Sequence, residues 1–332
     1  PLERAREVTL ELAGLRANRD GEGPDELEIR GDVGWTGWIS CAGGLPWGQP
    51  QDQRPDETHS LVYDGEPLED ELEILGHPRL RARICASAPV AYLSAKLCDV
   101  HPDGTSQLVT RGLLNLAHRD SREEPSELTP GAWYDVALEL EVTSWIFEPG
   151  HRVRLDLAGS DWPNAWPPPH GGTLTVDRAG TALDLPALAG PAPIERTPVL
   201  PPPRRPQAER ASARGDDLQE VEWRVEHDVL RRETRAVVRY GGPSEATDAA
   251  PAIDQRYDGT VGVSTDDPGR AFVSSSATYE LRFPEATVRS ESRLRIESDS
   301  DAYHVRVEVD AGEDGETRWS RRWERRFPRN RQ

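Results

Sequence analysis

The sequence contains few residues of several types, and each shortage excludes a kind of site or a class of protein. The 332 residues include no methionine, three cysteines and one lysine, Lys96. Three cysteines imply no disulfide framework, and none are spaced as C-x-x-C, which argues against a zinc site. No apolar run approaches 18 residues and no secretory signal pattern is visible, so neither a membrane span nor a signal is expected. The expected location is therefore the reducing cytoplasm.

The charge balance is strongly acidic. The formal net charge is −19 at pH 7, which excludes nucleic acid as a partner, because phosphate binding needs a basic surface, and disfavours anionic membranes. A hydrophobic content of 36% suits β-rich domains, which leave one face of many strands in water. Since the chain begins at Pro1 without an initiator, we expect a fragment of a longer protein.

Residues 55–185 read as a succession of short strands. Two alternating strands, Tyr134 to Val142 and Val153 to Leu157, each follow a Pro-Gly turn. Other strands are expected from the same pattern around Leu80, Ala82 and Ile84, at Val90 to Leu97, at Leu108 to Leu116, at Leu174 and Val176, and at Leu183 and Leu185. Closely spaced strands and turns predict an all-β jelly roll or sandwich, and no helical stripe is long enough for a core helix.

The remaining segments divide the chain further. Residues 1–54 are expected to form a lead-in with a Gly- and Trp-rich loop, although Val8 to Leu15 alternates as a strand would. Residues 186–206 contain eight prolines and predict a semi-rigid linker. Residues 207–332 predict a second, smaller antiparallel unit with one charged face and one apolar face, which needs a cover. Within it, 241–270 is poor in hydrophobics and predicts a mobile loop around a short strand, Ile253 to Tyr257.

Candidate catalytic and metal-binding residues give weak signals. The sequence has no G-x-S-x-G nucleophile elbow, and Ser160-Asp161 is interpreted as a loop cap rather than part of a triad. The eight histidines include no H-x-x-x-H pair; His101, His118 and His151 lie on different strands or turns and could meet in space, but no metal site or cofactor is predicted. Acidic residues are too numerous for any pair to indicate a glycosidase.

The tryptophans are a further candidate feature. Ten are present against four phenylalanines, and five of them lie in Gly- or Pro-rich segments: Trp35, Trp38, Trp47, Trp162 and Trp166. Exposed tryptophans often line a ligand or protein contact, because a rigid aromatic plane binds at little entropic cost. Capping of the sandwich ends explains them equally well.

Several short motifs resemble, in order and spacing, the C-terminal non-catalytic region of the CocE/NonD serine hydrolases, the cocaine-esterase and X-Pro dipeptidyl-peptidase family. The resemblance runs from about Gly31 to Leu185, and it implies a jelly-roll, galactose-binding-like β-sandwich. The motifs that carry it are Asp52-Gln53-Arg54-Pro55, the stretch SLVYDGEPLEDELEILGHPRL, Asp99-x-x-Pro102-Asp103-Gly104, Pro149-Gly150-His151-Arg152 and Ser160-Asp161-Trp162-Pro163.

The resemblance also implies a role. In this family the Ser, Asp and His triad lies in an α/β-hydrolase domain ahead of the jelly roll, so no catalytic residue is assigned here. The jelly roll packs on that domain, and the loop leading into it borders the active-site cleft. Carried over, this points to residues 43–54, above all Trp47, Asp52, Gln53 and Arg54. The other residues expected at the cleft or interface are Trp35, Trp38, Trp162 and Trp166.

Two other functions stay open. The chain could be a free-standing β-sandwich that binds carbohydrate or protein through its Trp-lined loops. An independent enzyme that uses carboxylates is the least favoured alternative. The sequence does not distinguish ester, amide and X-Pro peptide substrates for the parent hydrolase, and it leaves a homo-oligomer open.

Overall fold

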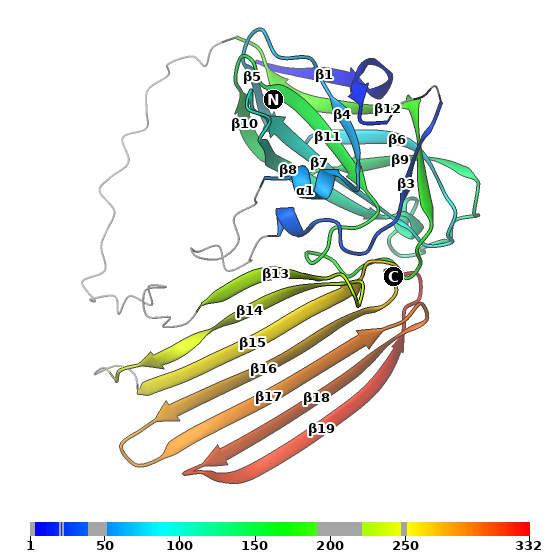
Figure 1. Cartoon of the computed structure of the whole chain (residues 1–332). Coiled ribbons are helices and arrows are strands. Elements are labelled where there is room, and N and C mark those ends of the chain that lie inside the picture. The colour runs from blue at the N-terminus through cyan, green and yellow to red at the C-terminus, as the bar shows by residue number, and fades with distance from the viewer. Residues whose placement is uncertain (1–3, 20, 22, 39–51, 191–220, 247–250) are drawn as a thin grey trace.

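The computed structural model describes residues 4–19, 21, 23–38, 52–190, 221–246 and 251–332. These residues form three antiparallel sheets, two in a sandwich and one in a separate C-terminal layer (Figure 1). The helices among them are short: α1 (Arg54–Glu57) and the 3-10 turns Leu12–Gly14, Trp35–Gly37 and Leu116–His118. The predicted all-β class is confirmed. No helix of the described part is long and apolar enough to cross a membrane.

The first sheet of the sandwich is built around one long strand, β12 (Thr173–Leu188). Its strand order is β10-β5-β12-β6-β9, and two further strands, β1 and β3, also pair with β12. The bounds are β1 (Ala5–Glu11), β3 (Asp25–Glu28), β5 (Leu72–Gly76), β6 (Arg79–Ala86), β9 (Trp133–Glu139) and β10 (Thr143–Phe147).

The second sheet has the order β2-β4-β11-β7-β8. Its members are β2 (Arg16–Ala17), β4 (Leu61–Asp64), β7 (Tyr92–Val100), β8 (Ser106–Asn115) and β11 (Arg152–Ala158). Alternate residues of each sheet face the shared core; on β6, for example, Leu80, Ala82 and Ile84 are buried while Arg79 and Arg81 are exposed. Strand β7 is buried along its whole length, so every polar side chain on it needs a partner inside the protein.

Two segments before residue 54, Ala5–Glu11 and Asp25–Glu28, form strands of the first sheet. β1 pairs with the second half of β12, with Val8 opposite Leu185, and β3 pairs with its first half, with Leu27 opposite Leu174. Because β6 occupies only one edge of β12, the other edge offers free backbone groups that these two short strands bind. Both strands extend the first sheet into the predicted lead-in 1–54, whose limits stay an interpretation. The expected strand from Val8 ends at Glu11, where a 3-10 turn begins.

The C-terminal sheet is a simple meander in the order β13-β14-β15-β16-β17-β18-β19. Its strands are β13 (Glu222–Asp228), β14 (Glu233–Ser244), β15 (Ala252–Ser264), β16 (Ala271–Arg282), β17 (Thr287–Ser298), β18 (Ala302–Glu313) and β19 (Glu316–Pro328). The expected mobile loop at 241–270 is wrong for residues 241–244, which belong to β14, and for 252–264, which form β15; the short strand expected at Ile253 to Tyr257 lies within β15. Backbone pairing with both neighbours holds this polar strand, and Gly262 leaves room for the ring of Phe272.

The two faces of this sheet differ as the alternation predicted. Apolar side chains from five neighbouring strands lie in one row on one face: Ala236, Val261, Val273, Ile296 and Val305. The opposite face carries arginine–carboxylate pairs, among them Arg239–Asp258 and Arg293–Asp310. The end of the chain returns to the junction with the sandwich (Figure 1).

The four-part division of the chain stays an interpretation at its boundaries. Strand β12 extends to Leu188, into the predicted proline-rich linker 186–206, of which residues 191–206 lie outside the described residues. The predicted C-terminal unit 207–332 is described from residue 221 onward, and its first strand begins at Glu222.

Candidate functional site

The predicted site residues Asp52, Gln53 and Arg54 are held against the second sheet. Asp52 forms an isolated bridge with Gln107 of β8, and the backbone N–H of Gln53 donates to the carbonyl of Ser106 at 2.9 Å. Helix α1 begins at the next residue, Arg54. The segment that enters the sandwich is therefore fixed at the edge of β8, at the start of α1.

Asp52 and Arg54 form an ion pair at the start of α1. Arg54 Nε donates to Asp52 Oδ2 at 2.7 Å, and the backbone N–H of Ser106 donates to Asp52 Oδ1 at 3.2 Å. Burial opposes ionisation of this carboxyl, but the bonds from Arg54 and Ser106 outweigh it and lower the pKa of Asp52. The Arg54 side chain stays 54% exposed, so its guanidinium is accessible to a ligand or a neighbouring domain.

Gln53 points the other way, into the protein. It is fully buried, and its side-chain Nε2 donates to the carbonyl of Thr36 at 3.0 Å. The backbone N–H of Thr36 in turn donates to Asp56 Oδ2 at 3.1 Å. Gln53 therefore ties α1 to the 3-10 turn Trp35–Gly37, and its role is structural rather than ligand-binding.

The single lysine of the chain lies beneath α1. Lys96 on β7 donates from Nζ to Asp56 Oδ2 at 3.0 Å, and both side chains are almost completely buried, at 1% and 2% exposure. Burial alone would lower the pKa of Lys96, but the nearby carboxylates of Asp56, Asp156 and Asp161 raise it. Lys96 is therefore a buried positive charge on the face of β7 opposite the sandwich core, where α1 covers it.

Asp156 shares this buried cluster. It lies directly opposite Lys96 in the pairing of β11 with β7, and neither of its carboxylate oxygens has a hydrogen-bond partner. Burial raises the pKa of Asp156 to about 6, although the charge of Lys96 opposes the shift. Lys96, Asp56 and Asp156 thus share a space closed to water. Asp156 is the member whose carboxylate oxygens make the fewest hydrogen bonds.

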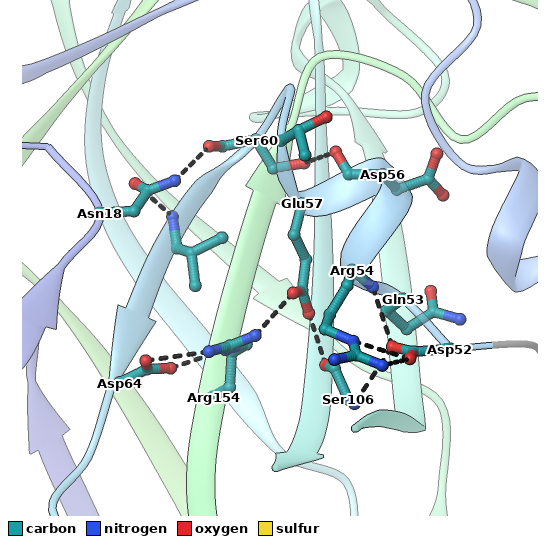
Figure 2. A network of polar contacts seen from close by, with 12 residues as sticks. Asn18, Asp52, Gln53, Arg54, Asp56, Glu57, Ser60, Asp64, Ser106 and Arg154 are labelled. Carbon is teal, nitrogen blue, oxygen red and sulfur yellow. Dashed lines mark hydrogen bonds and ion pairs between the residues drawn. The ribbon is translucent and has the colours of Figure 1, made fainter. Parts of the chain in front are cut away.

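A second ion-pair system lines the surface beside α1 (Figure 2). Arg154 on β11 binds Asp64 on β4 through two bonds, Nε to Oδ1 at 2.6 Å and Nη2 to Oδ2 at 2.9 Å. Its Nη1 donates to Glu57 Oε2 at 2.6 Å, and Ser106 Oγ donates to the other oxygen of Glu57. Burial opposes ionisation of Asp64, but the bonds and charge of Arg154 outweigh it and lower the pKa of Asp64.

These side chains form a shallow groove of about 480 Å³. Arg154 lies in its floor with 14% exposure, while Arg54 and Arg16 flank it with 54% and 70% exposure. Among the described residues, its lining is Arg16, Ala17, Asn18, Arg54, Glu57, Thr58, Val62, Asp64 and Arg154. Two exposed guanidinium groups beside a polar floor suit a carboxylate-bearing or otherwise anionic group. These described lining residues include no histidine or cysteine.

The four predicted tryptophans that the structure describes, Trp35, Trp38, Trp162 and Trp166, lie at the junction with the C-terminal sheet. Trp162 is 1% exposed and packs in a cluster with Ala236, Val263 and Ala271 of that sheet. Trp38 packs on Trp223 with 4.1 Å between ring centroids and an angle of 34° between the ring planes. The predicted apolar face is therefore covered by the sandwich at this end.

The other two described tryptophans make polar and edge contacts at the same junction. Trp166 Nε1 donates to Ser298 Oγ at 3.0 Å, and Trp35 meets the ring of His227 edge-on at 5.7 Å between centroids. Trp47 lies outside the described residues. The structure therefore groups Trp35, Trp38, Trp162 and Trp166 at this junction, and the turn that carries Trp35 is bonded to the α1 segment through Gln53 and Thr36. Their expected place at a catalytic cleft stays a prediction.

Ser160 is a structural residue. It is 1% exposed, and its hydroxyl lies within hydrogen-bonding distance of two backbone carbonyls, those of Arg30 at 2.7 Å and Val33 at 3.0 Å. This bonding to backbone agrees with its interpretation as a loop cap.

Sequence reasoning missed the buried cluster of Lys96, Asp56 and Asp156. One signal was available: the only lysine of the chain interrupts the apolar run Val90 to Leu97. A lysine in a strand that is buried on both faces needs an acidic partner. The identity of that partner depends on the long-range pairing of β7 with β11 and the placement of α1.

A large part of the chain is matched by a known protein family. A family model described as the X-Pro dipeptidyl-peptidase C-terminal non-catalytic domain matches residues 1–199, which is more than half of the chain. The class is thus a non-catalytic β-sandwich of hydrolases. The chain belongs to the X-Pro dipeptidyl-peptidase C-terminal domain family, and the resemblance found in the sequence is confirmed.

Individual relatives agree with this family. The chain is 34% identical over 116 residues to the cocaine esterase of Rhodococcus sp. strain MB1 Bresler, which covers 34% of this chain and 20% of that protein. It is 25% identical over 160 residues to the Xaa-Pro dipeptidyl-peptidase of Lactobacillus delbrueckii subsp. lactis, over 38% of this chain and 20% of the relative. The chain therefore spans about a fifth of the length of these curated relatives.

Among solved structures, a selenomethionine-labelled α-amino acid ester hydrolase resembles the chain with a TM-score of 0.45 and 21% identity, over 50% of this chain and 32% of that one.

Proposed function

We propose that this chain is the C-terminal part of a serine hydrolase whose α/β-hydrolase domain, with its Ser, Asp and His triad, lies earlier in the same polypeptide. The family match over residues 1–199 carries the proposal. It is supported by relatives of which the chain spans about a fifth. The parent enzyme would cleave an acyl ester, an amide or an X-Pro peptide bond, and this chain would stabilise it without taking part in the chemistry.

Within that enzyme, the groove beside α1 would border the substrate cleft. Two features support this role. Asp52 and Arg54 are held rigidly by Ser106 and by each other, so a domain packed here would meet a preformed surface. The exposed Arg54 guanidinium offers donors to an acidic group of the substrate or of the catalytic domain. Arg54 would then help to shape the acyl or leaving-group pocket.

A free-standing binding module is less well supported. That alternative rested on tryptophans that present their rings to a ligand. Trp162 is buried, and Trp35, Trp38 and Trp166 are half-buried against the C-terminal sheet, so the aromatic surface is largely used within the chain.

The first experiment compares the isolated chain with the complete protein. Both are incubated with a p-nitrophenyl acyl ester, an X-Pro chromogenic substrate and a serine-reactive fluorophosphonate. We expect turnover and labelling of one serine in the complete protein and neither in the isolated chain. Labelling of the isolated chain, at Ser160 or any other serine, would contradict a non-catalytic role.

A second experiment tests the groove in the complete protein. Arg54→Ala should raise KM several-fold and leave the rate of fluorophosphonate labelling unchanged, because Arg54 is proposed to touch the substrate side of the cleft and not the nucleophile. The matched control is Arg239→Ala, which removes an exposed arginine–carboxylate pair of the C-terminal sheet. Equal kinetics for the two variants would place the substrate cleft away from α1.

A further inference from the structure

Two histidines and one aspartate come together where β7 ends and β11 begins. Asp99 lies on β7, His101 on the turn that follows, and His151 immediately before β11. One ligand atom from each residue lies within 4.8 Å of those of the other two, and this is the one such three-residue group that the described part of the chain contains. His118, which the sequence analysis considered together with His101 and His151, does not belong to this group.

The aspartate is held in a fixed orientation. Asp99 is 2% exposed, and its two oxygens accept separate hydrogen bonds, Oδ1 from His151 Nδ1 at 2.8 Å and Oδ2 from Trp145 Nε1 at 3.0 Å. An ionised carboxylate only accepts, so the proton of neutral His151 sits on Nδ1 and Nε2 keeps its lone pair. A carboxylate that orients an imidazole in this way is the usual outer-shell partner of a metal-binding histidine.

The second histidine has the same arrangement. His101 Nε2 lies 3.1 Å from Gln107 Oε1, which also only accepts, so Nε2 carries the proton and Nδ1 keeps a lone pair. The rings of His101 and His151 lie 4.5 Å apart between centroids, at 40° to each other. Two imidazoles that each keep a free lone pair thus stand beside a buried carboxylate.

We propose that His101 Nδ1 and His151 Nε2 bind one divalent transition-metal ion of the Zn²⁺ class, with Asp99 as the outer-shell carboxylate that orients His151. Imidazole nitrogen is a ligand that zinc and its neighbours prefer over calcium or magnesium, which take oxygen ligands. Two protein ligands would leave the remaining positions for water. Such an ion would cross-link the turn after β7 to the start of β11, and this role is independent of the hydrolase proposed above.

Binding requires a small movement, which the fold permits in one member. Ligands of a tetrahedral zinc at bonds of roughly 2.0–2.1 Å lie roughly 3.4 Å apart, and the ligand atoms of this group lie within 4.8 Å of one another, so a small closure is enough. Asp99 and His151 are buried among strands, whereas His101 is half-buried on a turn. His101 is therefore the ligand that would move onto the ion.

The test is a titration of the 332-residue chain with Zn²⁺ and with Co²⁺ at pH 8, followed by calorimetry and by the visible spectrum of Co²⁺. We expect one ion per chain and a rise of several degrees in the unfolding temperature. Absence of saturable binding, or equal binding of Ca²⁺, would overturn the proposal.

Variants identify the site. His101→Gln should weaken Zn²⁺ binding at least tenfold and still fold, since His101 is only half-buried. The matched control is His304→Gln. His304 Nε2 lies 3.2 Å from Asp299 Oδ2, but this pair belongs to no group with a second histidine among the described residues. The Zn²⁺ affinity of this variant should equal that of the wild type. Loss of binding in a Cys41→Ser, Cys85→Ser variant with retention in His101→Gln would place the ion on thiols and overturn the assignment.

The role of His151 is tested by spectroscopy on the wild-type protein, because replacement of this buried residue could prevent folding. Two-bond ¹H–¹⁵N correlation spectra of the wild-type side chains should show His151 protonated at Nδ1, with its Nε2 signal shifted when Zn²⁺ is added. An unchanged His151 spectrum at saturating Zn²⁺ would overturn the proposal.

Discussion

Lys96 Nζ and Asp56 Oδ2 lie 3.0 Å apart in a region that water does not reach. This contact joins β7 of the sandwich to α1, the turn that carries the predicted site residue Arg54. A buried pair adds little net stability over apolar residues of equal volume, but loss of one partner leaves an uncompensated charge. The pair therefore fixes where α1 sits, and with it the groove beside α1.

Removal of the lysine charge alone should be costly. Lys96→Met leaves Asp56 buried without its partner, and we expect the free energy of unfolding to fall by about 3–5 kcal/mol. The double variant Lys96→Met, Asp56→Asn should recover a large part of this loss, because it removes both charges. Urea unfolding of the two single variants and the double variant measures the coupling.

An exposed ion pair provides the control for this cycle. Arg239 and Asp258 lie 2.6 Å apart with both side chains 49% exposed, so loss of this pair should cost no more than about 1 kcal/mol. Additive effects of Lys96→Met and Asp56→Asn would show that the two buried groups do not depend on each other.

Asp156 should make the protein less stable as pH rises. Its pKa is raised from 3.8 to about 6 in the folded state, so between these values the folded chain binds more protons than the unfolded chain, and stability falls with pH. Asp156→Asn removes this slope. Relative to wild type, the variant should gain about 1–3 kcal/mol of stability between pH 4 and pH 7.

Asp64, in the same sheet, should have the opposite effect on the pH dependence of stability. Its pKa is lowered in the folded state, so its contribution to stability is present above the ordinary range of a carboxyl and is lost as pH falls through its folded pKa. The deficit of Asp64→Asn against wild type should therefore shrink toward low pH. Unfolding curves of both variants across pH 3–8 measure the two trends; slopes of equal sign would contradict the assigned environments.

The alternation of apolar and polar residues was enough to predict many of the sandwich strands. It was not enough to predict the full length of β15 or the pairing of β1 and β3. Leu80, Ala82 and Ile84 occupy every second position, so the sequence predicts that they share one face of a strand and lie in the core. The structure confirms this prediction. β15 has few apolar residues, and pairing along both of its edges, which a local pattern does not reveal, makes it a strand. β1 and β3 likewise depend on the length of β12.

The candidate site shows the same division. Motif order located Asp52, Gln53 and Arg54 at the entry to the sandwich, as the structure has them. The direction of each side chain was beyond the sequence: Gln53 is buried while Arg54 is exposed. The partners of Arg154 and Lys96 come from segments 40 to 97 residues away, which only the sheet pairing brings together.

The junction between the sandwich and the C-terminal sheet should depend on its tryptophan contacts. Trp38→Ala removes the contact with Trp223, and we expect faster hydrogen exchange in β13 and β14 while the sandwich core stays protected. Trp319→Ala is the matched control, because this tryptophan is 46% exposed on the edge strand β19. Equal exchange in the two variants would show that the Trp38–Trp223 contact does not hold the units together.

Arg154 should not tolerate replacement by lysine. Its guanidinium binds Asp64 through two parallel bonds and Glu57 through a third, a fork that a lysine ammonium cannot reproduce. Arg154→Lys should therefore lower the free energy of unfolding by about 1–3 kcal/mol, whereas Arg54→Lys, which changes an exposed pair, should leave it unchanged within error. Chemical denaturation of both variants at low and high salt separates the two cases, because salt screens an exposed pair far more than a buried one. Equal losses for the two variants would mean that the three bonds of Arg154 contribute no more than one surface contact.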